Sequence, residues 1–503
     1  MVESYDLAVI GGGVNGVAIA RDAAGRGLTV FLAERADLAG ATSSASTKLI
    51  HGGLRYLEQG AFRLVREALH ERDVLLKSAP HIIWPLRFVL PVSRGGRPFW
   101  MLRLGLAIYD RLGGETSLAG TKVLDLRDDV AGAPLSDPSK ALEYSDCWVD
   151  DARLVVLLAR DAADLGARIA TRTPCVSAKI SDGRWRLRLE PEHGRPYEIT
   201  ASALVNAAGP WVDRVEASVV GDASPGHIRL VRGSHIVVRR ALPAGRAYIL
   251  QNVDRRIVFA IPYEGEFTLI GTTDVDVTGD PAAVAAPSEE EIAYLLDAVN
   301  RHFTKPITRS DVHWSYGGVR PLYDDGAKAA QSATRDYVLA LAAEDGAPAQ
   351  LNIYGGKITT FRRLAEHALE RLKPHLPAHR GPWTASAPLP GGDFSKENVD
   401  RLRTDLKARY PFLAPKTATR LVRSYGTLAY DLLGEARSAD DLGRCFCGDL
   451  SEREVGYLVE REFAMTAEDI LWRRSKLGLW ASLDEAVALD TFLGERRAAS
   501  PER

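Results

Sequence analysis

The sequence is poor in cysteine and lacks any long apolar run. Four cysteines occur among its 503 residues, and their spacing fits neither a zinc site nor a disulfide framework. We therefore expect a reducing compartment and no metal site. No run of about 18 apolar residues is present, which excludes a helix that crosses a bilayer. Glycines and charges interrupt the first apolar stretch, so no signal peptide is expected.

An excess of basic charge is also missing. Lys and Arg number 64 against 66 Asp and Glu, a net charge of −2, which argues against a polycationic nucleic-acid binder. Hydrophobic residues make up 46% of the chain, as is typical of a folded soluble protein. The chain is too long for one hydrophobic core, so we expect two or three domains.

The first 34 residues have a nucleotide-binding pattern. Tyr5–Ile10 is a predicted strand, Gly11, Gly13 and Gly16 fit the G-x-G-x-x-G spacing before a helix, and a second strand ends in Glu34. Gly11 allows a tight turn, Gly13 lets a pyrophosphate approach, and Gly16 allows close packing of helix on strand. The helix N-terminus favours phosphate. A carboxylate at Glu34 accepts hydrogen bonds from an adenosine ribose, so the pattern predicts a bound adenine dinucleotide.

The residues after Glu34 favour FAD over NAD. A nicotinamide dehydrogenase would continue with more βα units, whereas residues 43–53 are rich in hydroxyl side chains and glycine. FAD binds extended and requires donors along its length. Segments 201–213 and 351–373 are each predicted to bring a strand and a glycine turn back to the nucleotide. In the second segment we expect Thr359 or Thr360 to cap a helix whose positive end stabilises a reduced flavin.

Longer motifs identify a family. The segments IGGGVNG, ATSSASTKLIHGGLRYLE, EYSDCWVDDARL, GSHIVV, IGTTD, GVRPL and GGKITTFR occur in this order. Over nearly its whole length the sequence resembles the FAD-dependent glycerol-3-phosphate dehydrogenase family, in particular its aerobic respiratory members. The resemblance implies oxidation of sn-glycerol 3-phosphate to dihydroxyacetone phosphate on FAD, with electrons passed to membrane quinone. It implies a cytoplasmic enzyme, peripheral on the inner face of the plasma membrane; a homodimer is left open.

The expected FAD contacts lie in the N-terminal motifs and in the later glycine turns. Hydroxyl side chains supply hydrogen bonds there, and bare glycines let the backbone approach the cofactor. The expected contacts are Gly11, Gly13, Asn15, Gly16, Glu34, Arg35, Ser43, Ser44, Ser46, Thr47, Lys48, His51, Gly52, Gly53, Leu54, Val176, Ala208, Gly209, Trp211, Gly356, Lys357, Ile358 and Thr359.

The implied substrate is a phosphate dianion, so its site requires cations. Arg55 and Tyr56 directly follow the glycine turn that the flavin needs, and Arg320 follows a second glycine turn in SYGGV. Lys357 lies between the flavin-facing turn and the following helix. In the family, the positions that match Arg55, Arg320 and Arg335 lie in the substrate pocket. Charge-assisted hydrogen bonds to phosphate are among the strong ones, so we expect all five side chains to contact the substrate.

His235 is the expected general base. It lies on a predicted strand, and a histidine pKa near 6.5 suits the acceptance of an alcohol proton at neutral pH. His51 is the competitor, but its place in the flavin-wrapping segment favours a cofactor contact. Thr272 ends another predicted strand and is expected to bind the substrate. The expected catalytic residues are His235, Arg320 and Lys357.

These assignments define the expected fold class, which is α/β. We expect a Rossmann-like FAD-binding domain, an antiparallel-sheet substrate domain and an α-helical C-terminal domain. The predicted ranges are 1–80, 145–225 and 315–388 for the first, 81–144 and 226–314 for the second, and 389–503 for the third.

Other classes of function remain alternatives. A glycerol-3-phosphate oxidase would use the same fold and pass electrons to O₂, and an amino-acid-oxidase-like flavoenzyme would bind a carboxylate instead of a phosphate. A non-catalytic FAD-binding regulator would lack the chemistry of His235 and Arg320, and both residues are present. An NAD(P)H-dependent reductase is disfavoured because no second G-x-G-x-x-G unit follows.

Residues 81–112 mix aromatic side chains with arginines and allow two interpretations. The first is a membrane-surface segment, in which apolar side chains enter the headgroup boundary and arginines meet anionic lipid. The second is a core helix with a basic rim. The side chains concerned are Trp84, Phe88, Phe99, Trp100 and Met101, with Arg87, Arg94, Arg97 and Arg103.

Overall fold

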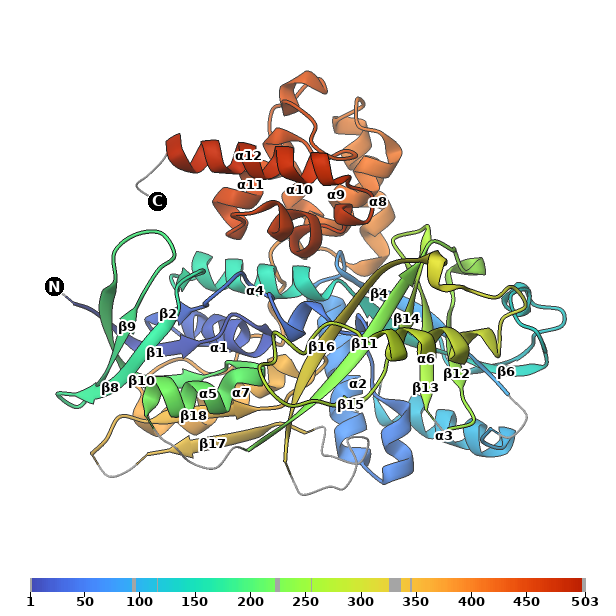
Figure 1. The fold of residues 1–503 in the computed structure, drawn as a ribbon, viewed down its shortest axis with the longest axis horizontal. Coiled ribbons are helices and arrows are strands. Elements are labelled where there is room, and N and C mark those ends of the chain that lie inside the picture. Colours follow the sequence, from blue (N-terminus) through green and yellow to red (C-terminus); the bar gives the residue numbers. More distant parts are fainter. Residues whose placement is uncertain are drawn as a thin grey trace.

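The computed structural model describes residues 2–92, 96–114, 116–221, 227–254, 256–324, 336–343 and 346–499. They form two β-sheets and a group of C-terminal helices, which lies above both sheets in Figure 1. The predicted combination of a Rossmann-like α/β part, an antiparallel sheet and a helical C-terminal domain is confirmed.

The first sheet is mainly parallel. Its strands are β1 (Glu3–Ile10), β2 (Val30–Ala33), β7 (Arg168–Ala170), β8 (Cys175–Ser181), β9 (Arg184–Leu189), β10 (Tyr197–Asn206), β17 (Val338–Ala342) and β18 (Gln350–Tyr354). In space the order is β17-β18-β10-β1-β2-β7, with the β8–β9 hairpin beside β10. β1 pairs in parallel with both β2 and β10, and β10 with β18.

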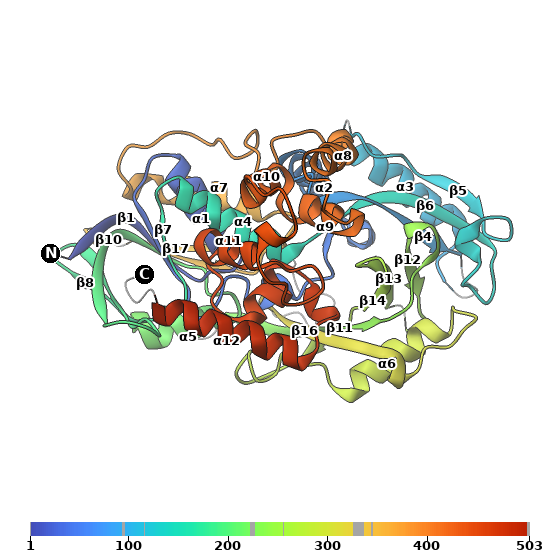
Figure 2. The same cartoon turned by 90° about the horizontal axis from the view of Figure 1, so that it is seen from above.

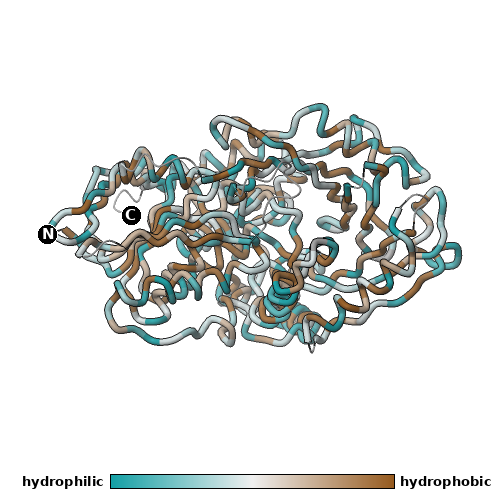
Figure 3. Tube along the Cα trace, turned by 90° about the horizontal axis from the view of Figure 1, so that it is seen from below, coloured by the Kyte–Doolittle hydropathy of each residue, from teal (hydrophilic) through white to brown (hydrophobic). Residues whose placement is uncertain are grey.

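Both faces of this sheet are buried. Leu7 and Val9 of β1 pack into one core with α1 (Val14–Gly25), α4 (Asp151–Asp164) and α7 (Phe361–Leu372), whereas Ala8 and Ile10 face a second core. Successive side chains of a strand point to opposite faces, so an unbroken apolar run suits a strand covered on both sides. Figure 3 shows these hydrophobic segments side by side in the half of the molecule that contains the N-terminus.

The second sheet is mainly antiparallel. Its strands are β3 (Leu49–Ile50), β4 (Ile83–Pro91), β5 (Lys122–Asp125), β6 (Lys140–Val149), β11 (Ile228–Val238), β12 (Ala247–Gln251), β13 (Ile257–Tyr263), β14 (Phe267–Gly271), β15 (Val275–Asp276) and β16 (Val312–Tyr323). The strands predicted within 226–314 are present, and β11, β13 and β14 pair in antiparallel fashion; the β4–β12 pair is parallel.

Two strands cross the predicted domain boundaries. β6 and β16 belong wholly to the second sheet, although the expected boundaries at 144/145 and 314/315 divide each of them. Gly317 and Gly318, expected to form a turn, lie inside β16, which pairs with β11 along its length. Other chain segments pass close by: a Cβ at Gly317 would lie 2.2 Å from the Ala285 carbonyl oxygen, and one at Gly318 2.9 Å from the Ala45 Cβ.

Residues 81–112 do not form one helix. They divide into β4 and α3 (Phe99–Leu112), so the interpretation as a single core helix is wrong. Phe88 is buried inside the second sheet, whereas Trp100 of α3 is 67% exposed. Arg94 lies outside the described residues. Among the described helices, none is long and apolar enough to cross a membrane.

The remaining helices either pack beside the two sheets or form the C-terminal domain. They are α2 (Phe62–Ser78), α5 (Val212–Val215), α6 (Glu289–Asn300), α8 (Val399–Arg409), α9 (Pro415–Tyr425), α10 (Ala429–Leu433), α11 (Glu452–Glu462) and α12 (Leu483–Ala499). Helices α8–α12 enclose a core of their own. Seen from above, they lie over the middle of the molecule (Figure 2). A buried ion pair between Arg153 of α4 and Glu462 of α11 joins this domain to the first sheet.

His81 is buried where the C-terminal domain meets the rest of the chain. Its ring lies 6.4 Å from that of Phe394, and neither ring nitrogen has a hydrogen-bond partner among the described residues. Burial, with the charges of Arg153 and Arg423, lowers the pKa of His81 to about 3.

We expect acid to destabilise this junction through His81. An unfolded histidine takes up a proton near pH 6.5, whereas folded His81 does so only near pH 3. Its contribution to stability is therefore full above about pH 6.5 and is lost as the pH falls toward 3. His81→Leu should flatten the fall in unfolding free energy below about pH 6.5 by up to about 1.4 kcal/mol per pH unit. Thermal melts measure this, with exposed His193→Leu as the control; an unchanged slope in His81→Leu would contradict it.

Candidate active site

A cavity of about 1260 Å³ lies where the two sheets and the C-terminal domain meet. Its wall includes the residues that follow the carboxyl ends of β1, β2, β10 and β18. Ligands of open α/β sheets bind at this edge. The volume exceeds that of an ordinary small-molecule pocket, so the cavity has room for an extended dinucleotide together with a substrate.

The glycines of the first motif have different structural roles. Gly11 has φ +114°, and a Cβ there would lie 2.5 Å from the Ala207 carbonyl oxygen. A Cβ at Gly16 would lie 1.9 Å from the Gly11 carbonyl oxygen, so Gly16 acts by packing and does not line the cavity. Gly13 does line it, at the start of α1. The next backbone N–H, that of Val14, donates to the Ser43 hydroxyl at 3.0 Å, so a helix N-terminus faces the cavity beside a hydroxyl group.

Glu34 follows β2 directly and lines the cavity. Its carboxylate accepts hydrogen bonds from the backbone N–H groups of Gly12 at 2.6 Å and Ala36 at 2.8 Å. Burial raises the pKa of the Glu34 carboxyl. Each carboxylate oxygen has two lone pairs, so both can also accept a ribose hydroxyl. The Arg35 guanidinium lies 4.3 Å from the centre of the Trp211 ring, and both side chains line the same cavity.

The cavity wall contains most of the expected FAD contacts. They are Gly11, Gly13, Asn15, Glu34, Arg35, Ser43, Ser44, Ser46, Thr47, Lys48, His51, Gly53, Leu54, Ala208, Gly209, Trp211, Gly356, Lys357, Ile358 and Thr359. This combination of close-approach glycines, a helix N-terminus, a carboxylate and hydroxyl donors fits FAD.

The other expected FAD contacts, Gly16, Gly52 and Val176, do not line the cavity. Gly52 faces α2 and α3, where a Cβ would lie 2.6 Å from the Leu69 side chain. At Val176 the strand register shifts between Cys175 and Ser177, so the Val176 side chain is exposed while Cys175 lines the cavity.

Asp151 holds the hydroxyl-rich loop and was not foreseen. Its carboxylate accepts from the Ser46 hydroxyl at 2.7 Å and from the buried Lys48 ammonium at 2.7 Å. The signal was present in the motif DDARL, where two adjacent aspartates stand at the start of a helix: Asp150 caps α4 and Asp151 is its first residue. Ser46 and Lys48 therefore line the cavity while their polar ends bind Asp151.

Five of the expected substrate residues line the same cavity. Arg55, Tyr56, Thr272, Arg320 and Lys357 all line the cavity. The Lys357 ammonium lies 3.8 Å from the centre of the Tyr56 ring. Expected Arg335 lies outside the described residues.

Asp274 orients Arg320 and was also not foreseen. The Arg320 guanidinium donates to the Asp274 carboxylate at 2.5 Å and to the Thr272 hydroxyl at 3.2 Å. Asp274 closes the IGTTD motif, in which only Thr272 was an expected substrate contact. The arginine is thus held at the cavity wall by two side chains that follow β14.

His235 does not line the cavity, contrary to the expected direct substrate contact. It lies on β11 between β14 and β16 and is 1% exposed. Its Nε2 lies 3.0 Å from the hydroxyl oxygen of Thr47, which does line the cavity, and its ring stacks on Tyr316. Burial, with the charges of Arg320 and Lys48, lowers the pKa of His235 well below its usual value. The ring is therefore neutral at pH 7 and reaches the cavity through Thr47.

His51 and Thr359 hold two cavity segments together. The His51 backbone N–H donates to the Thr359 hydroxyl at 3.3 Å. Burial, with the charges of Lys357 and Arg72, lowers the pKa of His51 to about 4. The expected helix cap by a threonine side chain is wrong. α7 follows Thr360 without a side-chain capping bond, and the hydroxyl of neighbouring Thr359 bonds the backbone of His51 instead.

The comparisons with known proteins define the class first. A family model described as FAD dependent oxidoreductase matches residues 6–362. A second, described as the C-terminal domain of alpha-glycerophosphate oxidase, matches residues 382–492. The protein is thus an FAD-dependent oxidoreductase, and FAD is its cofactor.

Full-length relatives narrow the class to a family. The chain is 53% identical to a glycerol-3-phosphate dehydrogenase of Pseudomonas aeruginosa, over 100% of this chain and 97% of that one. It is 48% identical to the aerobic glycerol-3-phosphate dehydrogenase of Escherichia coli, over 98% of each chain. It belongs to the FAD-dependent glycerol-3-phosphate dehydrogenase family. A D-erythritol 1-phosphate dehydrogenase of Brucella abortus is 52% identical over 94% of each chain.

Solved structures agree with the fold. The glycerol-3-phosphate dehydrogenase of Bacillus halodurans, complexed with FAD, matches with a TM-score of 0.77 and 26% identity, over 99% of this chain and 92% of that one. The L-alpha-glycerophosphate oxidase of Mycoplasma pneumoniae, with FAD bound, matches with a TM-score of 0.59 and 20% identity, over 77% of this chain and 99% of that one; at that identity only the fold is shared.

Gly13→Val should abolish FAD binding. A Cβ at this position would already lie 3.2 Å from the Ser43 hydroxyl, and the further methyl groups of valine would occupy the space that the pyrophosphate needs. The ratio of flavin absorbance to protein after purification measures the effect. Gly494→Val on α12, where a Cβ meets nothing closer than 4.0 Å, is the control and should retain FAD. A yellow Gly13→Val protein with full flavin content would contradict the assignment.

Proposed function

We propose that the protein oxidises sn-glycerol 3-phosphate to dihydroxyacetone phosphate and passes the electrons to membrane quinone. The proposal rests on one observation above all: the cations Arg55, Arg320 and Lys357 line the same cavity as the FAD-binding residues. A phosphate dianion requires such a cluster, whereas an amino-acid carboxylate does not. The names of the relatives support the same substrate.

The cations bind the phosphate and orient the substrate. Arg320 lines the cavity with a side chain that is 26% exposed, and its ion pair with Asp274 holds the guanidinium at the wall. Lys357, beside the Tyr56 ring, adds a second positive charge. Substrate held in this way presents its C2 alcohol to the cofactor, and bound FAD supplies the acceptor for the C2 hydride at N5.

The alcohol proton leaves through Thr47 to His235. Thr47 is the member of this pair that lines the cavity, and its hydroxyl oxygen is 3.0 Å from His235 Nε2. A threonine hydroxyl can accept one proton while it donates its own. A neutral His235 therefore acts as the base through Thr47, which lies between the imidazole and the substrate. Because the pKa of His235 is lowered, acid should reduce activity only below the usual histidine range.

A four-carbon polyol phosphate is the second candidate substrate. The relative named D-erythritol 1-phosphate dehydrogenase is almost as similar to this chain as the glycerol-3-phosphate dehydrogenase of Pseudomonas aeruginosa, 52% against 53% identity. The same cations would bind either phosphate. Use of O₂ as acceptor remains a further alternative, and the yield of peroxide per turnover distinguishes it from quinone reduction.

Anaerobic addition of glycerol 3-phosphate should bleach the flavin absorbance of the purified protein. Arg320→Ala removes charge-assisted bonds worth about 1.5–3 kcal/mol each, so bleaching should slow or require more substrate by roughly tenfold to a hundredfold. FAD content should stay unchanged. The exposed Arg309→Ala, which loses only its pair with Glu289, is the control. Wild-type bleaching by Arg320→Ala would show a structural arginine, and faster bleaching by D-erythritol 1-phosphate would favour the second candidate.

The membrane contact is proposed at α3 and the start of α2. Trp100 is 67%, Leu104 54% and Phe62 48% exposed, and exposed Arg103 lies among them on α3. Phe62, Leu104 and other apolar residues of α3 also line the cavity. An apolar opening at the lipid boundary would admit quinone, so we place the protein as a peripheral enzyme on the inner face of the plasma membrane.

Trp100→Glu combined with Arg103→Glu should weaken sedimentation with phosphatidylglycerol vesicles. The change removes an aromatic anchor and replaces a cation, which near anionic lipid contributes about 1 kcal/mol, with an anion. Salt should weaken the wild type in the same assay, and activity with a soluble dye should be retained. Leu483→Glu combined with Arg401→Glu, exposed positions of the C-terminal domain, is the matched control. Undiminished vesicle binding by the α3 variant would place the contact elsewhere.

A further inference from the structure

We propose that the C-terminal domain holds FAD in its site by clamping the loop that contains Glu34. The clamp is a set of buried ion pairs, here named the Asp37 cluster. Its members are Asp37 and Arg172 from the first-sheet region and Asp469, Arg473 and Arg474 from the π-helix Asp469–Arg474 of the C-terminal domain. The inference goes beyond the proposed function, because it concerns retention of FAD whichever substrate is oxidised.

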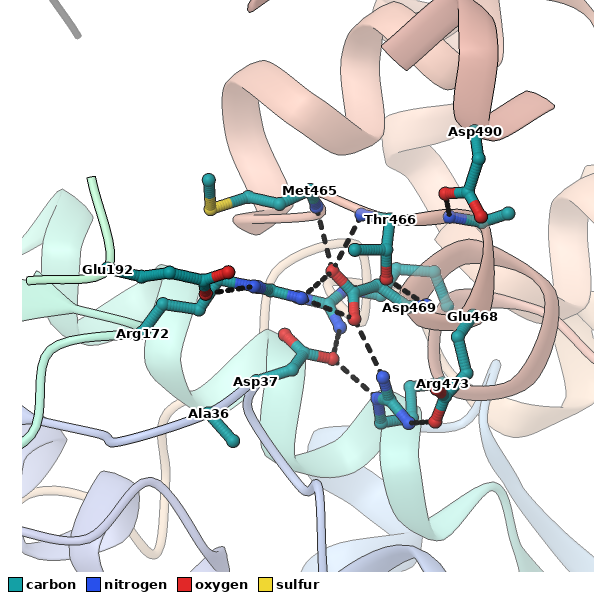
Figure 4. Close-up of polar contacts among 12 residues, drawn as sticks. Ala36, Asp37, Arg172, Glu192, Met465, Thr466, Glu468, Asp469, Arg473 and Asp490 are labelled. Carbon is teal, nitrogen blue, oxygen red and sulfur yellow. Dashed lines mark hydrogen bonds and ion pairs between the residues drawn. The ribbon is translucent and has the colours of Figure 1, made fainter. Parts of the chain in front are cut away.

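Asp37 is bound from the C-terminal domain. It is 3% exposed, and its carboxylate accepts a hydrogen bond from Arg473 Nε at 2.5 Å and one from Arg474. Among the described residues, these are the hydrogen-bond donors to the Asp37 side chain, and both come from the π-helix. Figure 4 shows the bond from Arg473. A buried carboxylate without such partners is costly, so the position of this loop depends on the docked domain.

Asp469 is linked to the same loop through Arg172. Its carboxylate accepts from Arg172 at 2.8 Å and from Arg473 at 2.7 Å, and backbone N–H groups complete its contacts (Figure 4). Although burial opposes ionisation, the charges of Arg474 and Arg172 lower the pKa of Asp469. The backbone N–H of Arg172 in turn donates to the Ala36 carbonyl at 2.8 Å. The loop is thus held through Asp37 and through Ala36.

This loop positions the carboxylate expected to bind the ribose. Glu34 is three residues before Asp37, and its carboxylate is hydrogen-bonded to Gly12 in the glycine-rich turn. A second hydrogen bond links this loop to the glycine-rich turn, from the Ala39 backbone N–H to the Gly12 carbonyl at 3.2 Å. Displacement of Asp37 would therefore disturb both the ribose contact and the pyrophosphate turn, although Asp37 itself does not line the cavity.

The C-terminal domain also forms part of the cavity wall. Glu468, Trp472, Arg473 and Lys476 line it. The Trp472 ring stacks on that of Trp314 of β16 at 4.3 Å, and the Lys476 ammonium donates to the Asp150 carboxylate at 3.1 Å. The domain therefore contacts both sheets beside the cofactor site. By linkage, if docking favours FAD binding, FAD binding favours docking by the same factor.

Asp37→Asn in the full-length holoenzyme should raise the FAD dissociation rate at least tenfold. Release is followed by the rise of flavin fluorescence after dilution. Arg172→Gln is the second variant. Arg172 also lies outside the cavity wall, and its substitution leaves Asp37 paired. This variant therefore still tests the proposal if Asp37→Asn does not fold. Asp37→Glu, which keeps the charge, should recover part of the retention. The control is Glu454→Gln, which weakens the Arg420–Glu454 pair inside the C-terminal domain without touching the Glu34 loop or the Arg153–Glu462 contact between the domains.

A second measurement tests the linkage without enzyme activity. In the wild type, FAD should slow backbone hydrogen exchange in residues 469–475, and in Asp37→Asn this protection should be lost. Wild-type FAD release by both folded variants would overturn the proposal. Equal acceleration by Glu454→Gln would also overturn it, because the effect would then follow from general loosening of the domain. Neither readout uses substrate, so a failure here is distinct from a failure of the proposed reaction.

Discussion

Parallel pairing on both sides of β1 is the constraint on which the rest of the structure depends. Ile10 pairs with Ala33 of β2 on one side and with Asn206 of β10 on the other. Because the strands run in the same direction, the turns that follow them meet at one edge. Gly11, Glu34 and Ala207 are brought together there, although almost 200 positions separate the first from the last. The cavity lies at this edge because β1, β2 and β10 all end there.

The second sheet supplies the chemistry that this edge lacks. β11 and β16 place His235 and Arg320 on neighbouring strands, and the turn after β14 adds Thr272 and Asp274. The two residues are also coupled electrostatically, because the charge of Arg320 helps to keep buried His235 neutral. A neutral imidazole behind a threonine hydroxyl and a cation at the cavity wall are the two groups that the proposed oxidation of a phosphorylated alcohol would use.

Buried charge decides how the C-terminal domain docks. The contact between this domain and the rest of the chain buries two sets of ion pairs. They are Arg153 with Glu462, and Asp37 with Arg473 and Arg474. Such pairs add little net stability, but a misplaced domain would leave each charge buried and unpaired, which is strongly unfavourable. The domain therefore has one favourable position, and in that position it closes the cavity beside the cofactor.

The sequence alone was sufficient for features encoded by near neighbours. These features are the G-x-G-x-x-G spacing, the acid at Glu34, the strands of the second sheet and the helical C-terminal end. Each depends on spacing or periodicity over a few residues, so it can be recognised without knowing which distant residues it contacts. The family motifs added the cofactor and the substrate cations. Most of the expected cofactor contacts do line one cavity.

Only the tertiary structure decided which side chains meet across long separations. Gly317 and Gly318 look like a turn locally, yet they lie within a strand because β16 pairs with β11 there, and glycine is needed because Ala285 and Ala45 pass against them. Thr359 was available to cap a helix, but the backbone of His51, 308 residues away, takes its hydroxyl. His235 is buried behind Thr47, and Asp37 and Asp151 gained roles through partners that no local pattern indicates. A hydrogen bond or an ion pair forms only where folding places donor and acceptor within about 3 Å, and that proximity is a property of the packed chain.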